Sequence, residues 1–252
     1  MNDLYWLTDE QMAKLSPFFP KSHGRPRVDD RRVLSGIIFI NRNGLRWRDA
    51  PKEYGPHKTL YSRWKRWSEK GIFARMMAGL AAEHGEKKTV MIDATYLKAH
   101  RTASSLGVKL GGRGRLIGRT KGGMNTKLHA ICDSQGRPLN LFVTAGQVSD
   151  YIGARALLSS IPNVDWLLGD RGYDADWFRD ALKDKGIRAC IPSRKQRKTP
   201  VKYNKRRYKR RNRIEIMFGR LKDWRRVATR YDRCPKVFLS AIALAATVIY
   251  WL

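Results

Sequence analysis

Apolar residues in the first third of the chain recur at the three- and four-residue spacing of amphipathic helices. Thr8 opens a capping-box pattern, which predicts a first helix over residues 9–19. The same periodicity predicts two further helices, over residues 30–43 and 59–70. Residues 1–85 are therefore expected to form a small all-helical domain.

The third of these helices places its basic side chains on a stripe of their own. Its apolar stripe includes Trp64 and Trp67, and its basic stripe consists of Arg63, Arg66 and Lys70. With the helix before it, this segment resembles a helix-turn-helix, whose recognition helix delivers arginines to a DNA groove. An ordinary amphipathic helix with a solvated basic face explains the same residues equally well.

From residue 88 onward the pattern changes to short apolar runs that are typical of strands. The predicted elements are strand 89–95, strands 127–132 and 139–145 joined as a hairpin, helix 151–158, strand 164–168, a helix ending at Lys185, and strand 188–191. Asp150 and Asp174 are expected to cap the two helices. Three consecutive strands followed by alternation predict an α/β, ribonuclease-H-like catalytic domain (βββαβαβα) over residues 86–252.

Two segments depart from this alternation. Residues 104–123 are rich in glycine and basic residues without periodicity, which predicts a loop. Residues 237–252 form one apolar run, shorter than the ~20 residues that a bilayer-spanning helix needs. We therefore predict a buried helix at the end of the sequence.

The charge of the chain indicates the class of its partner. Lys and Arg number 52 against 22 acidic residues, a net charge of +30, which indicates a polyanion such as nucleic acid. Basic residues with interleaved tyrosines dominate residues 194–213, a pattern that favours a surface following a DNA backbone. Charge alone does not distinguish a DNA-acting protein from an RNA binder of the ribosomal type. The three cysteines are widely separated and odd in number, which excludes a disulfide framework and a CxxC zinc site.

Three acidic residues stand where a carboxylate needs a partner. Asp93 interrupts an apolar strand, Asp170 ends another at a tight turn, and Glu215 is isolated within a basic segment. Carboxylates that converge can hold two Mg²⁺ ions, which is the arrangement that phosphoryl transfer from DNA requires. The structural alternatives are strand-end and turn-forming aspartates and a surface ion pair between Arg211 and Glu215.

Glu215 shares one face of a predicted helix with three neighbours. At 100° per residue, Tyr208, Arg211 and Lys222 lie within about 60° of one another and of Glu215. The adjoining apolar stripe can pack on the sheet while this face presents the carboxylate toward the two aspartates.

These motifs resemble those of DDE transposases of bacterial insertion sequences, in particular the insertion-sequence-five family. The four helix residues match the Y-R-E-K pattern of these enzymes at every position. The segments "MIDATYLKAH" around Asp93, "GDRGYD" around Asp170 and "GRTKGGMNTKLHA" between them are also similar. The likeness covers essentially the full length of the chain.

The resemblance implies that Asp93, Asp170 and Glu215 are catalytic and bind two Mg²⁺ ions, for which Mn²⁺ would substitute. It implies binding of the element's terminal inverted repeats by the N-terminal helices, then DNA strand cleavage and strand transfer into target DNA by a homodimer or larger assembly. The residues expected to contact DNA are Tyr208, Arg211, Lys222, Arg63, Arg66, Lys70, Arg206, Arg207 and Arg210. The short interval between the second and third acids leaves little room for a large inserted domain.

Two other functions remain open at this point. One is a structure-specific nuclease on the same fold, and the other is a catalytically inactive repressor derived from a transposase. Covalent attachment through Tyr208 is less favoured, because a tyrosine recombinase needs arginines and histidines clustered around its nucleophile. The first 19 residues lack the basic and apolar regions of a signal peptide. We expect a cytoplasmic, nucleoid-associated bacterial protein without a membrane partner.

Overall fold

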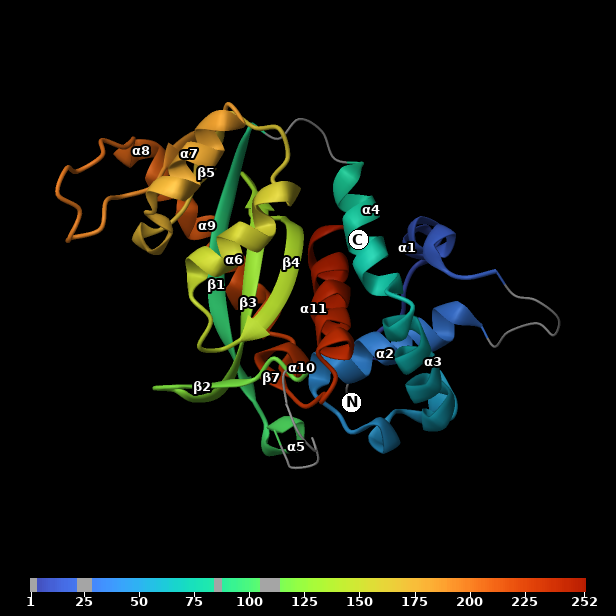
Figure 1. The fold of residues 1–252 in the computed structure, drawn as a ribbon. Coiled ribbons are helices and arrows are strands. Elements are labelled where there is room, and N and C mark those ends of the chain that lie inside the picture. Colours follow the sequence, from blue (N-terminus) through green and yellow to red (C-terminus); the bar gives the residue numbers. More distant parts are fainter. Residues whose placement is uncertain (1–3, 22–28, 84–87, 105–113) are drawn as a thin grey trace.

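The N-terminal helices form where the sequence places its periodic apolar residues (Figure 1). The computed structural model describes residues 4–21, 29–83, 88–104 and 114–252. This region consists of α1 (Asp9–Leu15), the 3-10 turn Ser16–Phe18, α2 (Asp30–Asn43), the 3-10 turns Trp47–Asp49 and Lys52–Tyr54, α3 (His57–Glu69) and α4 (Ile72–Ala82). The capping box at Thr8 is present, and α2 ends at Gly44, whose φ of 74° suits glycine.

Helix α4 is an addition to the predicted elements. Gly71, with a φ of 67°, separates it from α3. Buried side chains such as Ile72, Met76 and Leu80 line it, and it carries few charged residues. The charged face that marks an amphipathic helix is therefore weak, and the periodicity of residues 59–70 does not extend into it.

A seven-stranded mixed sheet follows the helical region. Its strands are β1 (Thr89–Ala99), β2 (Gly118–Thr120), β3 (Gly123–Asp133), β4 (Pro138–Ala145), β5 (Trp166–Leu168), β6 (Arg188–Cys190) and β7 (Thr229–Arg230). β3 pairs antiparallel with β1 and β4, whereas β5 runs parallel to both β1 and β6. The predicted ribonuclease-H-like order of strands and helices is confirmed.

Alternate residues of β1 point to two different sets of helices. The helices of this half are α5 (Arg101–Ser104), α6 (Asp150–Leu157), α7 (Asp176–Asp184), α8 (Lys205–Tyr208), α9 (Asn212–Lys222), α10 (Arg225–Ala228) and α11 (Pro235–Tyr250). Val90 and Ile92 join a hydrophobic cluster with α6 and α7. Met91 and Leu97 join a second cluster with α4, α9 and α11. Because side chains alternate along a strand, Asp93 lies on the face of the second cluster.

Helix α11 confirms the buried helix predicted from the last apolar run. In Figure 1 it lies between the sheet and the N-terminal helices, and its residues from Ala241 to Thr247 are all buried. One hydrophobic cluster continues from α2 and α3 through α11 to the sheet. The division of the chain at residue 85 stays a prediction. Among the described residues, no helix combines the length and apolar composition that crossing a membrane requires.

Two predicted helix caps are wrong. Asp150 is the first residue of α6, and its carboxylate pairs with Lys127 at 2.9 Å. Asp174 lies two residues before α7, whose N-cap position is occupied by Ala175. In both cases a cation distant in the sequence takes the carboxylate that was expected to accept a backbone N–H.

The predicted loop 104–123 is wrong in part. Residues 118–120 form β2, which pairs with the beginning of β3 from Gly118↔Asn125 to Thr120↔Gly123. Residues 105–113 of the predicted loop lie outside the described residues. β1 also extends beyond its predicted end at residue 95, because β3 pairs with it as far as Lys98.

Candidate active site

Asp93 lies in the middle of β1, and its side chain is 16% exposed. Burial raises the pKa of Asp93 to about 6, and the negative charge of Asp170 adds to this shift. The backbone N–H of Ala94 donates to its carboxylate at 2.8 Å and opposes the shift, as does the guanidinium of Arg211. Burial and the neighbouring carboxylate therefore outweigh the opposing effects of the Ala94 N–H and the Arg211 guanidinium.

Asp170 follows β5 at the same edge of the sheet. Met91 pairs with Leu168 in the parallel register, so Asp93 and Asp170 each lie two residues beyond this pair. The Oδ1 atom of Asp170 accepts the N–H of Gly172 at 2.8 Å, which fixes the turn that presents the carboxylate. The parallel register of these adjacent strands thus brings two of the three candidate acids together, just beyond the end of β5.

Glu215 lies in the first turn of α9 and is 56% exposed. Arg211 joins it to the strand, since the guanidinium donates to Asp93 Oδ2 at 2.7 Å and also to the Glu215 carboxylate. Asp93 and Glu215 therefore share one cation. Among the described residues, no three His, Cys, Asp or Glu side chains are grouped closely enough to hold a metal ion together.

The helix expected to carry the Y-R-E-K residues is interrupted. α8 ends at Tyr208, and the 3-10 turn Lys209–Arg211 precedes α9. The residues nevertheless lie toward β1: Lys222 Nζ donates to Thr95 Oγ1 at 2.7 Å, and Arg211 lies 5.8 Å from the centre of the Tyr208 ring. Burial lowers the pKa of Lys222. Two cations and an aromatic ring thus border the carboxylate edge.

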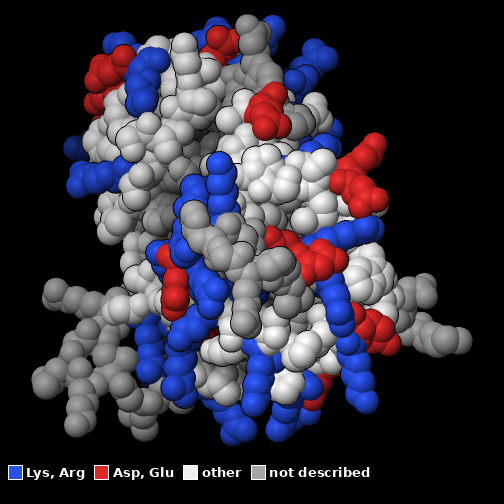
Figure 2. Space-filling model, turned by 90° about the vertical axis from the view of Figure 1, so that its right-hand side faces the viewer, with Lys and Arg blue, Asp and Glu red and all other residues white. Residues whose placement is uncertain are grey.

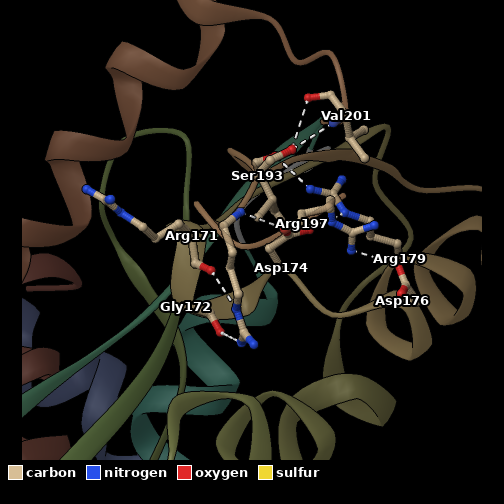
Figure 3. A network of polar contacts seen from close by, with 10 residues as sticks. Arg171, Gly172, Asp174, Asp176, Arg179, Ser193, Arg197 and Val201 are labelled. Atoms are coloured by element: carbon tan, nitrogen blue, oxygen red, sulfur yellow. Dashed lines mark hydrogen bonds and ion pairs between the residues drawn. The ribbon is translucent and has the colours of Figure 1, made fainter. Parts of the chain in front are cut away.

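Asp174, which closes the "GDRGYD" segment, is the centre of a polar network (Figure 3). Its side chain is fully buried and accepts Arg179 Nε at 2.8 Å, Arg197 Nε at 2.9 Å and the backbone N–H of Arg194 at 2.8 Å. Burial by itself raises the pKa of Asp174. The hydrogen bonds from these partners outweigh that effect and lower the pKa to about 2.

The same network fastens the turn that carries Asp170. The guanidinium of Arg194 donates to the carbonyl of Gly172 at 2.8 Å and to that of Arg171 at 3.3 Å (Figure 3). The segment after β6 is therefore tied to the residues directly after Asp170. We conclude that the buried Asp174 fixes Arg194, and that Arg194 in turn holds the turn after Asp170.

Sequence analysis did not identify Lys127 or its pairing with Asp150. This lysine of β3 is 5% exposed, pairs with Asp150 and lies 4.8 Å from the centre of the Tyr96 ring. A lysine in the apolar segment "TKLHAIC" was the available signal, because a buried ammonium group needs an anionic partner.

Three predicted DNA-contacting arginines line a small cavity beside α8. Arg206, Arg207, Arg210 and Asn204 surround about 250 Å³. Arg206 and Arg210 are exposed, whereas Arg207 is half-buried and lies 4.4 Å from the ring centre of Trp166. Several guanidinium groups around one hollow provide the donors that a phosphate group requires.

The three basic residues predicted in α3 have different environments. Arg63 pairs with Asp30 at 2.6 Å, and its side chain is only 11% exposed. Arg66 and Lys70 are exposed. Figure 2 shows the side of the molecule that faces right in Figure 1, where Lys and Arg side chains gather toward one end and acidic side chains lie among them.

Comparison with known proteins identifies relatives over both halves of the chain. Residues 7–77 match the family described as "Putative transposase of IS4/5 family", and residues 84–251 match the family "Transposase DDE domain". The chain is 34% identical over 128 residues to "Putative transposase for insertion sequence element IS6501" of Brucella ovis, covering 50% of this chain and 98% of that protein. It is 28% identical over 156 residues to "Putative transposase for insertion sequence element IS402" of Burkholderia cepacia, covering 54% and 72%.

A solved structure supports the fold. The piggyBac transposase in its synaptic complex with hairpin DNA has a TM-score of 0.53 to this chain, with 10% identity, and the match covers 97% of this chain and 72% of that one. At this identity the likeness shows the α/β, ribonuclease-H-like fold alone. The match to the DDE domain, in contrast, extends over more than half of the chain and includes all three candidate acids. The chain belongs to the DDE transposase family of IS4/5-type insertion sequences.

Proposed function

We propose that this transposase binds the terminal inverted repeats of its insertion sequence, cuts a DNA strand at each end and joins the freed 3′ ends to target DNA. The observation that best supports this function is the pair of carboxylates, Asp93 and Asp170, at one edge of the sheet. Arg211 links a third carboxylate, Glu215, to this edge. The net charge of +30 attracts DNA to the protein.

The donor chemistry of this edge fits a hard divalent cation. Two oxygen-donor side chains lie beside each other on adjacent strands, and burial raises the pKa of Asp93, an effect that a bound cation would oppose. Asp93, Asp170 and Glu215 would hold Mg²⁺, with Mn²⁺ as a substitute, once the Glu215 carboxylate leaves Arg211 and joins the two aspartates. A pair of such ions would supply Lewis acidity for the attack of water or of a 3′-hydroxyl on a DNA phosphate.

The residues around the carboxylates position the DNA strand. Arg211 holds Asp93 and Glu215 in place, and Lys222 adds a second cation on the same side of β1. Tyr208 would contact the DNA near the cut. We assign the neighbouring cavity of Arg206, Arg207 and Arg210 to a phosphate farther along the strand.

The N-terminal helices are proposed to recognise the ends of the element. Arg66 of α3 and Lys70, which directly follows this helix, are exposed and are the side chains offered to DNA, whereas Arg63 supports the helix through Asp30. Cutting two ends and joining them to one target requires at least two sites. We therefore propose a homodimer or a larger assembly on DNA.

The test combines the purified protein and Mg²⁺ with a plasmid that carries the DNA flanking its own gene. Sequencing of the products should reveal breaks at the inverted repeats and 3′ ends joined to new positions. Cuts without joining would support the structure-specific nuclease, and binding without cuts would support the inactive repressor. Omission of the divalent cation, with EDTA present, should abolish cutting while end binding persists.

A further inference from the structure

A second cavity lies beyond the carboxylate edge, between the β2–β3 hairpin and the end of β1. Its volume of about 600 Å³ falls within the range of small-ligand sites. It is lined by Tyr96 and Lys98 of β1, Arg119 and Lys121 of the hairpin, and Gln147 after β4. Figure 1 shows β2 reaching beyond the sheet at the side away from the N-terminal helices.

Tyr96 presents an aromatic ring at this cavity. Its side chain is 50% exposed, which is high for so large a ring inside a sheet. Lys127 Nζ lies 4.8 Å from the ring centre and is itself held by Asp150, so the ring has a fixed neighbour. An oriented and accessible ring offers a surface on which a nucleobase can stack.

The charges around the cavity favour an anion. Lys98, Arg119 and Lys121 are all exposed, and none of the described residues that line the cavity is acidic. A ring with three cations beside it matches the two parts of a nucleotide, because the base can stack while the phosphate is neutralised.

The hairpin that forms one wall is held in a defined conformation. Asn125, which is 3% exposed, donates from its side-chain amide to Thr120 Oγ1 at 2.6 Å and to the carbonyl of Gly123 at 2.8 Å. Gly123 has a φ of 94°, which other residues rarely adopt. The cavity is therefore built into the fold before any ligand binds.

The cavity lies a short distance from the carboxylates along β1. Tyr96 follows Asp93 by three residues of extended strand, about 10 Å at the usual rise of a β-strand. Because side chains alternate along a strand, Tyr96 lies on the face of β1 opposite to Asp93, where Lys127 of β3 is its cross-strand partner. The cavity is therefore separate from the carboxylates that are proposed to bind Mg²⁺.

We propose that this cavity binds an unpaired nucleotide of the DNA strand, with its base stacked on Tyr96 and its phosphate held by Lys98, Arg119 and Lys121. Only the assignment of this nucleotide to the DNA that is cut rests on the proposed function. Binding of an unpaired base is a separate property that can be measured without cleavage.

The test uses a six-nucleotide single-stranded DNA that contains 2-aminopurine, whose fluorescence is quenched by stacking. The full-length protein should quench it, and Tyr96→Ala should remove the quenching and weaken binding about tenfold, a typical effect of losing one stacked base. Tyr96→Phe keeps the ring and should behave as the unaltered protein. The matched control is Tyr151→Ala, which removes a tyrosine of α6 that is 42% exposed and lies outside the cavity lining.

Equal quenching by the unaltered protein and Tyr96→Ala would overturn the proposal. Loss of binding in Arg119→Ala with no effect of Tyr96→Ala would also overturn it, because the cavity would then bind only the DNA backbone. Cleavage of the element's ends is scored separately on the same preparations. A protein that quenches in a Tyr96-dependent way but does not cut refutes the proposed function alone, and one that cuts without such quenching refutes the nucleotide site alone.

Discussion

Asp93 and Asp174 are both largely withdrawn from solvent, yet their surroundings shift their pKa values in opposite directions. Asp93 has one guanidinium partner and another carboxylate nearby, and burial raises its pKa to about 6. Asp174 is also disfavoured by burial, but two guanidinium groups and a backbone N–H lower its pKa to about 2. Among the described residues, the Asp93 carboxylate thus has a single cationic partner, whereas the Asp174 carboxylate has two cationic partners and a backbone N–H.

This difference indicates that Asp93 can bind a ligand, whereas Asp174 stabilises the local structure. A carboxylate whose pKa is raised by burial and by a neighbouring charge is typical of functional sites. The saturated Asp174 lies only four residues after Asp170, and its partner Arg194 also holds the carbonyl of Gly172. The hydrogen-bonded network of Asp174 therefore lies directly beside Asp170, one of the acids that are proposed to bind the metal ion.

The largest difference between the two aspartates should appear in catalysis. Asp93→Asn keeps the shape of the side chain but removes the charge that would bind the divalent cation. Strand cleavage should fall by roughly a thousandfold or more, since metal-ion catalysis supplies several kcal/mol. Gel-shift binding of end DNA should remain within about twofold of the unaltered protein.

The matched control for this variant is Asp184→Asn, which neutralises an exposed aspartate at the end of α7. It should cut normally. The same loss is expected for Asp170→Ala and for Glu215→Ala. Cleavage at the normal rate by any of the three variants would remove that residue from the proposed metal-binding set.

The free energy of unfolding should depend more on Asp174 than on Asp93. Asp174→Ala leaves Arg179 and Arg197 without their common partner, and breaking a buried ion pair in this way costs about 3 kcal/mol or more of unfolding free energy. Urea denaturation at pH 7 measures the change. A loss below about 1 kcal/mol, the range of exposed ion pairs, would show that the network contributes little.

As the pH rises, the contribution of Asp93 to the free energy of unfolding should fall, whereas that of Asp174 should rise. The folded pKa of Asp93 is raised to about 6, so its contribution to stability is fully present below about pH 4 and is lost as the pH rises through 6. Asp93→Asn should therefore stabilise the protein by about 2 to 3 kcal/mol at pH 8 and by little at pH 4. Thermal unfolding in EDTA across this range measures the gain, and an equal gain at both pH values would contradict it.

For Asp174 the sign is opposite. Its lowered pKa means that its contribution is present above the unfolded value near 4 and is lost as the pH falls toward 2. Asp174→Asn should therefore cost more stability at pH 7 than at pH 3, in the same thermal unfolding experiment.

The positions of Asp93 and Asp170 could be predicted because local pattern determines them. Each is an acid in or directly after a short apolar run, and parallel pairing of such runs brings the carboxyl ends together. The order of strands followed from the same runs. The face shared by Arg211 and Glu215 was also predictable from helical spacing, although the 3-10 turn Lys209–Arg211 interrupts that helix.

Other features depend on contacts that no local pattern contains. The spacing of Asp174 suited a helix cap, but Arg194 and Arg197, twenty or more residues away, take its carboxylate. Lys127 likewise finds its partner Asp150 on another element. α4 escaped prediction because it packs against α11, and so lacks the polar face that distinguishes a surface helix.

The smallest expected effect concerns α3, the helix that we propose to contact DNA, where one arginine is exposed and another is paired within the fold. Arg66 is exposed, whereas Arg63 is compensated by Asp30 inside the fold. Arg66→Ala should lower the slope of the logarithm of end-DNA affinity against the logarithm of salt concentration by about 1, because one phosphate contact is lost. Arg63→Ala should leave this slope unchanged and reduce the unfolding free energy instead, since it removes the ion pair between Arg63 and Asp30. If Arg63→Ala lowers the slope and Arg66→Ala does not, Arg63 is the residue that contacts DNA. An ion pair within the protein would then not show that an arginine of this helix has only a structural role.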